Sequence, residues 1–399
     1  MRKIIIFNIA MFMSTMAIAE TATKTEHKNF NWFISTGLGY DNNVYQAPRA
    51  PYVDYAALPI GLNPTVNPRE ESGMFIPVEI KVETVKDHGQ NIRLVGLLSA
   101  TGSFYTREQL KNADKHNIRL HTGYEFVLAR EGKSENTFYA GVILGKHTQV
   151  YVDHDTGLNK TTTYTSTDIS NRYRYVNMGV EAKYKHRIGR VDYGVSSQLL
   201  RFDYEDSVAV SQLDNSYFRW GGVVSLPIIA QIKLDLSYDR AVRDYFYRHT
   251  HDELGTYRSA YPLLQYSYNV FGANLRERIS PEWLLYLDYV RTLRTDAYVG
   301  YNDYAENKFG LRLLYEQGAF KTKLTLHHWE RDYPNGFAFD VAGQGAKIYS
   351  GNELKLKAEM RVDKNFALWS ELKQEVQSTT DLRYDFEGRQ IMAGMSWSD

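Results

Sequence analysis

From residue 30 onward the chain repeats one unit, a stretch of about ten residues with alternating apolar and polar side chains, followed by a turn. The run 74–83, Met-Phe-Ile-Pro-Val-Glu-Ile-Lys-Val-Glu, shows the pattern clearly. An alternation with period two is typical of a β-strand whose two faces meet different environments. The repeated unit therefore predicts an all-β chain that folds into one antiparallel sheet.

The connections between the predicted strands alternate in length. The short ones fall at sites such as 87–91 and 187–190, and the long ones at 41–73, 151–171, 241–260 and 331–351. An even strand count with short turns at one end and long loops at the other is typical of barrels in bacterial outer membranes. We therefore predict a transmembrane antiparallel β-barrel of about sixteen strands, with a range of about 14–18, over residues 30–399. The predicted strands are 31–40, 74–86, 92–105, 117–129, 137–150, 172–186, 191–204, 217–226, 229–240, 261–275, 283–294, 306–316, 320–330, 352–362, 366–376 and 387–397.

The first nineteen residues resemble a cleaved signal peptide. Arg2 and Lys3 supply the positive end, an apolar stretch follows, and Ala17-Ile18-Ala19 provides a small-residue cleavage site. Residues 20–29 would then form a short periplasmic segment, and the outer membrane would be the destination. Beyond the leader, no apolar run approaches the ~18 residues that a membrane helix needs. A soluble β-sandwich or propeller is the alternative fold, but we find no repeated blade motif.

Charge and composition narrow the function classes. The chain has 47 basic and 47 acidic residues, and no basic segment with interleaved aromatic residues stands out, so we expect no nucleic-acid partner. Cysteine is absent, which excludes disulfides and thiol chemistry. Among the eleven histidines, His249 with His251 and the pair His327 and His328 are the best metal candidates. His249 and His251 lie in a predicted loop and are more simply explained as solvated side chains. His327 and His328 are adjacent on a predicted strand and face opposite ways, so they cannot share a site. We therefore expect no metal and no cofactor.

The two faces of the strands separate apolar from charged residues. Predicted outward residues are Ile76, Val78, Ile80, Val82, Val176, Met178, Val180, Ala182, Leu354, Leu356, Ala358 and Met360. Predicted lumen-lining residues are Glu79, Lys81, Glu83, Glu181, Lys183, Lys185, Glu353, Lys355, Lys357, Glu359 and Arg361. A lysine or arginine facing lipid at the midplane costs about 2–4 kcal/mol, so the charged set belongs in a wet interior. A barrel of this size is wide enough for an aqueous channel, and the mixed signs predict weak ion selectivity.

The first long connection, 41–73, contains half of the ten prolines of the chain. Prolines restrict the backbone, and the segment also carries aromatic and charged residues. We predict a folded lid or constriction loop that uses Tyr45, Arg49, Tyr52, Asp54 and Tyr55. The alternative is an exposed loop whose prolines block edge pairing. The Asp-Asn-Asn run at 41–43 favours a turn over a calcium site, since both use the same residue types.

The C-terminal strand 391–397 has alternating apolar residues, an internal glycine and a nearly terminal aromatic. It resembles the assembly signal of outer-membrane barrels, with Gly394, Met395 and Trp397 as its recognisable positions. The usual pattern ends on the aromatic, whereas Ser398 and Asp399 follow here. The stretch 39–44 is similar to the end of the first strand in some Gram-negative barrels associated with polysaccharide export. Together these features resemble the porin-like class, which implies contact with lipid, lipopolysaccharide and the barrel-assembly machinery.

A further cluster, Arg240, Arg243, Tyr245, Tyr247 and Arg248, lies at a strand end. It is either an interfacial girdle, which we favour, or a grip for sugar rings and acidic groups. The predicted function is a passive channel for small or saccharide-like solutes. The alternative is an envelope-assembly or exopolysaccharide-export barrel plugged by its first loop. A surface enzyme or adhesin is less favoured, because no Gly-x-Ser-x-Gly or phosphate loop occurs, and a rim hydrolase is the enzyme alternative. The sequence leaves the oligomeric state open.

Overall fold

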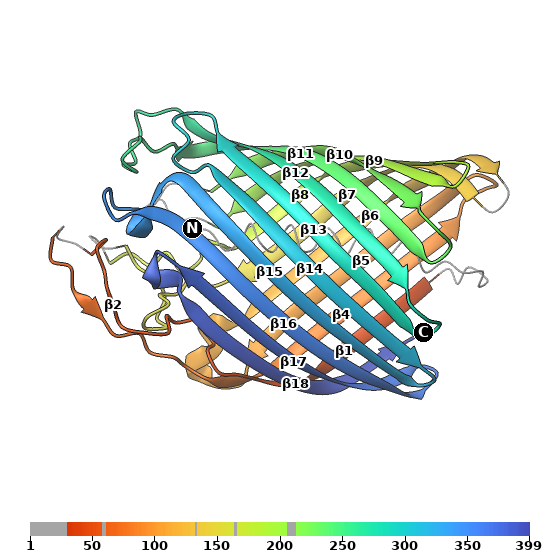
Figure 1. Ribbon diagram of the computed structural model, residues 1–399, viewed down its shortest axis with the longest axis horizontal. Coiled ribbons are helices and arrows are strands. Elements are labelled where there is room, and N and C mark those ends of the chain that lie inside the picture. Colours follow the sequence, from red (N-terminus) through yellow and green to blue (C-terminus); the bar gives the residue numbers. More distant parts are fainter. Residues whose placement is uncertain (1–29, 58–60, 132–133, 163–165, 206–212) are drawn as a thin grey trace.

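One closed antiparallel barrel makes up nearly all of the protein (Figure 1). The computed structural model describes residues 30–57, 61–131, 134–162, 166–205 and 213–399. The predicted signal peptide and periplasmic segment lie outside the described residues. The barrel has sixteen strands, each paired with its neighbours in the chain, and β1 closes the ring against β18. The predicted fold class and strand count are therefore confirmed.

The strands and the small additional sheet have the following bounds. The barrel strands are β1 (Phe30–Asp41), β4 (Gly73–Asp87), β5 (Ile92–Tyr105), β6 (Lys115–Glu131), β7 (Ser134–Gln149), β8 (Tyr175–Ile188), β9 (Val191–Tyr204), β10 (Asn215–Pro227), β11 (Ile232–His249), β12 (Leu263–Arg278), β13 (Trp283–Asp296), β14 (Tyr304–Gln317), β15 (Phe320–Phe337), β16 (Ala346–Asp363), β17 (Phe366–Thr379) and β18 (Phe386–Ser398). Between β1 and β4, β2 (Tyr52–Val53) and β3 (Thr65–Val66) form a two-stranded sheet. Short 3-10 helices lie at Glu108–Ala113, Ala338–Asp340 and Leu382–Tyr384.

Three strands extend further toward the loop end than the sequence predicted. β11 ends at His249 rather than at 240, β15 ends at Phe337 rather than at 330, and β16 begins at Ala346 rather than at 352. In these extensions the alternation continues with Tyr and Arg in place of aliphatic residues. A wet lumen accepts polar side chains at strand positions, so these residues belong to strands. The loops are therefore shorter than the predicted ranges 241–260 and 331–351.

The first and last strands meet along a closely packed seam. Ile34 pairs with Trp397 and Gly37 with Gly394, and the backbone N–H of Asp399 donates to the carbonyl of Trp32 at 3.2 Å. Neither glycine has room for a side chain, because a Cβ on Gly37 would lie 2.3 Å from the carbonyl oxygen of Ala393. The seam therefore depends on small residues on both strands.

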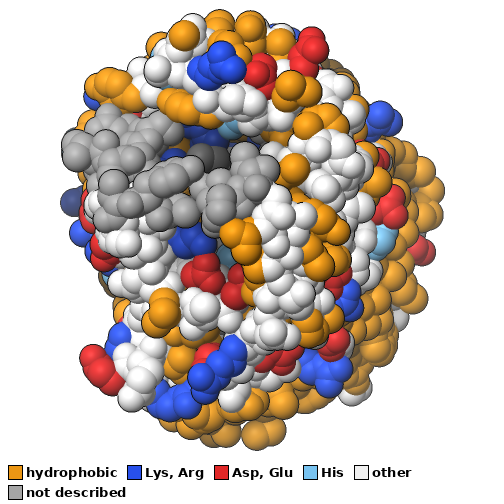
Figure 2. All heavy atoms as spheres, turned by 90° about the vertical axis from the view of Figure 1, so that its left-hand side faces the viewer, with side chains coloured by type: hydrophobic (Ala, Val, Ile, Leu, Met, Phe, Trp, Pro, Cys, Tyr) orange, Lys and Arg blue, Asp and Glu red, His pale blue; other side chains and the backbone are white. Residues whose placement is uncertain are grey.

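Apolar residues face outward along the barrel. Ile76, Val180, Leu356 and Met360 are among the exposed large hydrophobic side chains. Figure 2 looks onto the loop end, where charged side chains lie beside the central hollow and the flank at the lower right is mainly hydrophobic. An apolar exterior around a polar lumen is the arrangement expected in an outer-membrane barrel. No helix in the described segments is long and apolar enough to cross a membrane.

Candidate functional site: the lumen and its lid

The strand register places the predicted lining residues on inward faces. On each strand the charged lining residues alternate with exposed hydrophobic residues. On β8, for example, Glu181 and Lys183 alternate with Met178 and Val180. The ion pairs found on these faces are Lys81–Glu79 at 2.6 Å, Lys183–Glu181 at 3.1 Å, Lys355–Glu353 at 3.2 Å, Lys357–Glu359 at 3.8 Å and, from the neighbouring strand, Lys373–Glu353 at 3.6 Å. Histidines add His121–Glu181 at 2.9 Å and His327–Glu353 at 3.2 Å. Among the described residues, Glu83, Lys185 and Arg361 share these faces without an ion pair. The lining is thus a partly neutralised charge network.

The first loop, 42–72, is held against several other loops rather than extending freely. Tyr45 is buried, and its hydroxyl donates to Asn112 at 2.6 Å in the second loop, 106–114. Arg49 forms an ion pair with Asp385 at 2.5 Å in the eighth loop, 380–385. The local turn at its start is an Asx turn, since Asp41 Oδ1 accepts from the N–H of Asn43 at 2.9 Å. The residues predicted for a lid or constriction loop therefore lie in a folded segment.

Tyr52 connects loops from opposite sides of the mouth. Its hydroxyl donates to Oδ2 of Asp155 at 2.8 Å in the third loop, 150–174, and its ring lies 6.2 Å from that of Phe339 in the seventh loop, 338–345. Tyr55 meets the same Phe339 ring edge-on at 5.3 Å. Half of the strands of the barrel separate the third loop from the seventh in either direction. The first loop therefore bridges the mouth, and we call these three loops the lid.

The polar contacts inside the lid are partly buried, which changes their acid–base properties. Burial raises the pKa of Asp155, and the nearby Asp153 and Asp54 carboxylates raise it further, although the Tyr52 hydroxyl opposes this. Asp155 Oδ1 has no hydrogen-bond partner. Burial also favours the neutral form of Asp153, but its hydrogen bond and ion pair with Lys160 outweigh this and lower its pKa. Asp54 caps its own turn by accepting from the N–H of Ala56 at 2.9 Å.

The cluster predicted at the end of β11 divides between the two faces of the sheet. Arg243, Tyr245 and Arg248 are buried on the lumen side, whereas Arg240 and Tyr247 are exposed. The Arg248 guanidinium lies 5.8 Å from the Tyr245 ring centre. The girdle interpretation therefore applies to Arg240 and Tyr247 only. The other three belong to the wall of the lumen, because period-two alternation and the irregularity after Asp244 turn them inward.

These residues begin a larger arginine–tyrosine wall that the sequence analysis missed. The Arg294 guanidinium lies 4.3 Å from the Tyr266 ring centre and 4.4 Å from that of Tyr304. Arg331 lies 4.7 Å from the Tyr304 ring and pairs with the buried Glu306. A signal was present in the sequence, because Arg and Tyr recur two residues apart, as at Arg331 with Tyr333 and at Arg243 with Tyr245, and residues two apart on a strand share a face.

The residues of the predicted assembly signal lie in β18 on both faces. Gly394 faces the lumen and packs against Trp369, whose ring would lie 2.6 Å from an added Cβ. Met395 is exposed on the outer face, and the ring of Trp397 lies 5.4 Å from that of Phe366. These contacts explain why a small residue and an aromatic occupy the two positions in the folded barrel.

The histidine candidates do not gather into a metal site. His249 Nδ1 lies 2.5 Å from the backbone carbonyl of Tyr261, and His251 lies beside the ring of Tyr301 at 5.5 Å. His328 contacts Asn352 at 3.0 Å, on the face opposite to His327 and Glu353. Within the described part of the chain, no group of three His, Cys, Asp or Glu side chains is arranged to hold a metal ion.

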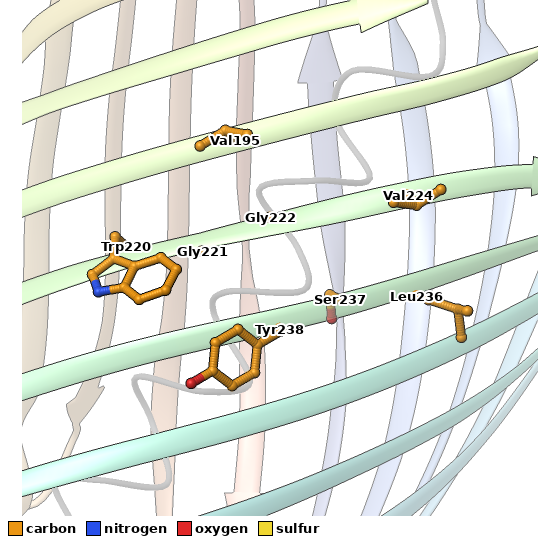
Figure 3. A pocket seen from close by; sticks show the side chains of 8 residues that line it. All are labelled: Val195, Trp220, Gly221, Gly222, Val224, Leu236, Ser237 and Tyr238. Atoms are coloured by element: carbon orange, nitrogen blue, oxygen red, sulfur yellow. The ribbon is translucent and has the colours of Figure 1, made fainter. Parts of the chain in front are cut away.

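A shallow apolar hollow lies on the outer surface of β9–β11 (Figure 3). Its walls include Val195, Trp220, Leu236 and Tyr238, and Gly222 leaves the space between them open. These residues alternate with the inward-facing Arg219 and Asp239, so the hollow faces outward. It is therefore part of the outer face of the barrel and not of the lumen.

The chain is a closed sixteen-stranded barrel, and its likeness to known proteins is one of fold. No protein-family model matches the sequence, and no curated protein matches it significantly. Similar solved structures include OmpT of Vibrio cholerae with loop L8 deleted, with 8% identity over 93% of this chain and 100% of that one, at a TM-score of 0.45. A mutant Rh. blastica porin matches with 11% identity over 93% and 99%, at 0.35. A bacterial polysaccharide outer-membrane secretin matches with 9% identity over 94% of this chain and 99% of that one, at a TM-score of 0.45.

Proposed function

We propose that this barrel is a passive channel for small or saccharide-like solutes, with an outer mouth that the lid narrows. The observation that carries the proposal is the polar, charged lining of a sixteen-stranded ring. Ring size supports it, because barrels with about sixteen strands leave room for an aqueous passage. The lining ion pairs run along the wall, since Lys81 pairs with Glu79 within β4 and Lys355 with Glu353 within β16, so they neutralise charge at the wall itself.

The test is single-channel conductance of the refolded protein in a planar bilayer, with and without residues 45–70. Steady openings of the intact protein are expected, and they should become larger in the deletion variant. Heat-modifiable gel mobility verifies folding of both forms. If neither form conducts ions although both are folded, the channel is ruled out.

A second candidate is an export or envelope-assembly barrel that the first loop plugs until a partner engages it. The bridge formed by Tyr52 between the third and seventh loops favours this candidate, because a plug requires such anchoring. Its signature in the same experiment is conductance that arises only after residues 45–70 are removed. Under either function, lipid, lipopolysaccharide and the barrel-assembly machinery are proposed partners, the last through Gly394, Met395 and Trp397.

A rim hydrolase or adhesin receives less support. The loop residue His154 directs Nδ1 at the backbone carbonyl of Tyr45 at 2.5 Å, and His249 directs its Nδ1 at the carbonyl of Tyr261. A histidine in such a contact fixes loop geometry and is poorly placed to activate a serine. We therefore propose that the protein is not an enzyme, and hydrolysis of ester and peptide substrates by the refolded barrel is the assay that would overturn this.

A further inference from the structure

The wall of the lumen is uneven, because side-chain size differs from strand to strand round the ring, although the charged β4 lies among the strands with small residues. On β18, β1 and β5 the inward positions are mostly glycines and small hydroxyl residues: Ser35, Gly37, Gly39, Ser99, Thr101, Ser103, Gly394 and Ser396. On β11–β15, which begin half a turn from β1 and end three strands from β18, they include arginines, lysines and aromatic residues. The small residues leave space in the lumen.

Several basic residues on β11–β15 lack an ion pair, as Lys185 and Arg361 do elsewhere in the described lumen, while others, such as Arg312 and Arg331, are paired. Among the described residues, Arg243, Arg294, Lys308 and Lys323 have no carboxylate partner. Arg294 donates instead to the backbone carbonyl of Asn302 at 2.9 Å. Three cations, Arg312, Lys355 and Lys357, and one carboxylate, Glu371, act on Lys323, which stands directly opposite Lys357 in the β15–β16 register. The facing lysines repel each other, and Glu371, opposite Lys357 on β17, offsets part of this repulsion.

The same wall carries buried polar atoms without partners. Arg243 Nε, Tyr268 Oη, Thr292 Oγ1 and Tyr304 Oη make no hydrogen bond, although each belongs to a residue buried on one of the four adjacent strands β11–β14. Leaving such an atom unsatisfied destabilises the folded protein, because the atom has lost its hydrogen bonds to water. Four of them on neighbouring strands indicate a site that a polar ligand or ordered water completes.

We propose that Arg243, Arg294, Lys308 and Lys323, with the unpaired hydroxyls of Tyr268, Thr292 and Tyr304, form a track for acidic saccharides. Sugar hydroxyls complete the hydrogen bonds of those oxygens, and carboxylates on the sugar complete the charge-assisted hydrogen bonds of the cations. The arginines lie nearer the loop end, whereas Lys308 and Lys323 continue the track toward the turn end. The lumen then prefers anions, in contrast to the weak selectivity that the mixed signs predicted. This inference rests on the proposed channel and specifies its substrate class.

The test compares block of the ion current by trigalacturonate, maltotriose and the non-sugar tricarballylate. The expected order is strong block by trigalacturonate and little by the other two. The double variant Lys308→Gln, Lys323→Gln should weaken that block on the order of tenfold or more. Lys81→Gln removes a lumen charge from β4, at least five strands away from both lysines, and should weaken it less than twofold. If Lys81→Gln weakens the block as much as the double variant does, the block depends only on the total charge of the lumen. If tricarballylate blocks as strongly as trigalacturonate, the lumen recognises charge and not sugar. Either result overturns the track.

A second pair of variants tests the loop-end part of the track. Arg243→Gln should weaken trigalacturonate block, whereas Arg240→Gln, on the same strand but facing outward, should not. Heat-modifiable mobility shows whether each variant folds. Calorimetric binding of trigalacturonate to the detergent-solubilised protein separates the two proposals. Binding without conductance would contradict the channel and leave the track standing, whereas conductance without binding or block would contradict the track alone.

Discussion

The Tyr52 hydroxyl and Oδ2 of Asp155 form a 2.8 Å hydrogen bond between loops that begin on different parts of the barrel rim. Tyr52→Phe removes this bond while keeping the ring contact with Phe339. A lost hydrogen bond to a charged group costs about 1.5–3 kcal/mol, so the lid should open more often. Longer open times in single-channel recordings are the expected result. Tyr55→Phe, which keeps its own contact with Phe339, is the control, and equal behaviour of the two variants would mean that the bond does not hold the lid.

Lid closure should depend on pH through Asp155. The pKa of Asp155 is higher in the closed lid than its ordinary value of 3.8, so the closed form takes up a proton more readily than an open form. As pH falls through that raised pKa, closure is strengthened, and this gain is complete below 3.8. Conductance should therefore fall on acidification in this window, and Asp155→Asn should remove the dependence.

A second titration opposes the first at lower pH. The pKa of Asp153 is lowered in the closed lid, so the stability from its pair with Lys160 is present above 3.8 and is lost as pH falls through its folded pKa. The expected profile is a minimum of conductance on the acidic side. A conductance that rises steadily as pH decreases from neutrality would contradict the assignment to Asp155.

Charges on the β4 wall should tune the ion selectivity in opposite directions. Glu79 and Lys81 pair at 2.6 Å, and both face the lumen. Glu79→Gln leaves Lys81 uncompensated and should move the reversal potential toward anions, whereas Lys81→Gln should move it toward cations. Both variants should retain the heat-modifiable mobility of the folded barrel. Unchanged reversal potentials in both would show that these residues do not border the conducting path.

The seam between β1 and β18 should be sensitive to side-chain volume. Gly37→Ala places a methyl group where the Ala393 carbonyl lies 2.3 Å away, so the strands must separate locally. Overpacking of this kind costs about 1–3 kcal/mol. The variant should unfold at lower temperature or denaturant concentration on heat-modifiable gels. Gly388→Ala in the neighbouring β18, where no atom lies within 4 Å of an added Cβ, is the matched control.

The periodic signal predicted the barrel well because each strand reports its own two environments. Glu79 and Ile80 differ in polarity because one faces water and the other lipid, and neighbouring residues suffice to reveal that difference. The lid was predictable only as a folded segment. Its contacts join Tyr52 to Asp155 and Phe339, which are distant in sequence, and a local pattern contains no information on such pairs.

The arginine–tyrosine wall was predictable in part, less fully than the barrel and more fully than the contacts of the lid. Arg331 and Tyr333 share a face by alternation, so their orientation followed from the sequence, but the strand itself was predicted to end at 330. The wall also needs Arg294 to reach Tyr304 on the next strand, which depends on register. Register follows from the whole ring and its turns rather than from any single strand.

The glycine-lined seam also determines the order in which the ring is completed. Every other pairing in the ring joins strands that follow one another along the chain, whereas β1 and β18 come from the two ends of the barrel sequence. Until they meet, each exposes a row of unpaired backbone groups, which in lipid is a severe cost and in water invites aggregation. Their encounter closes the longest loop in the molecule and carries its largest ordering entropy. A protected environment that holds β1 in place until β18 is available would therefore accelerate folding more than any stabilisation of the interior strands.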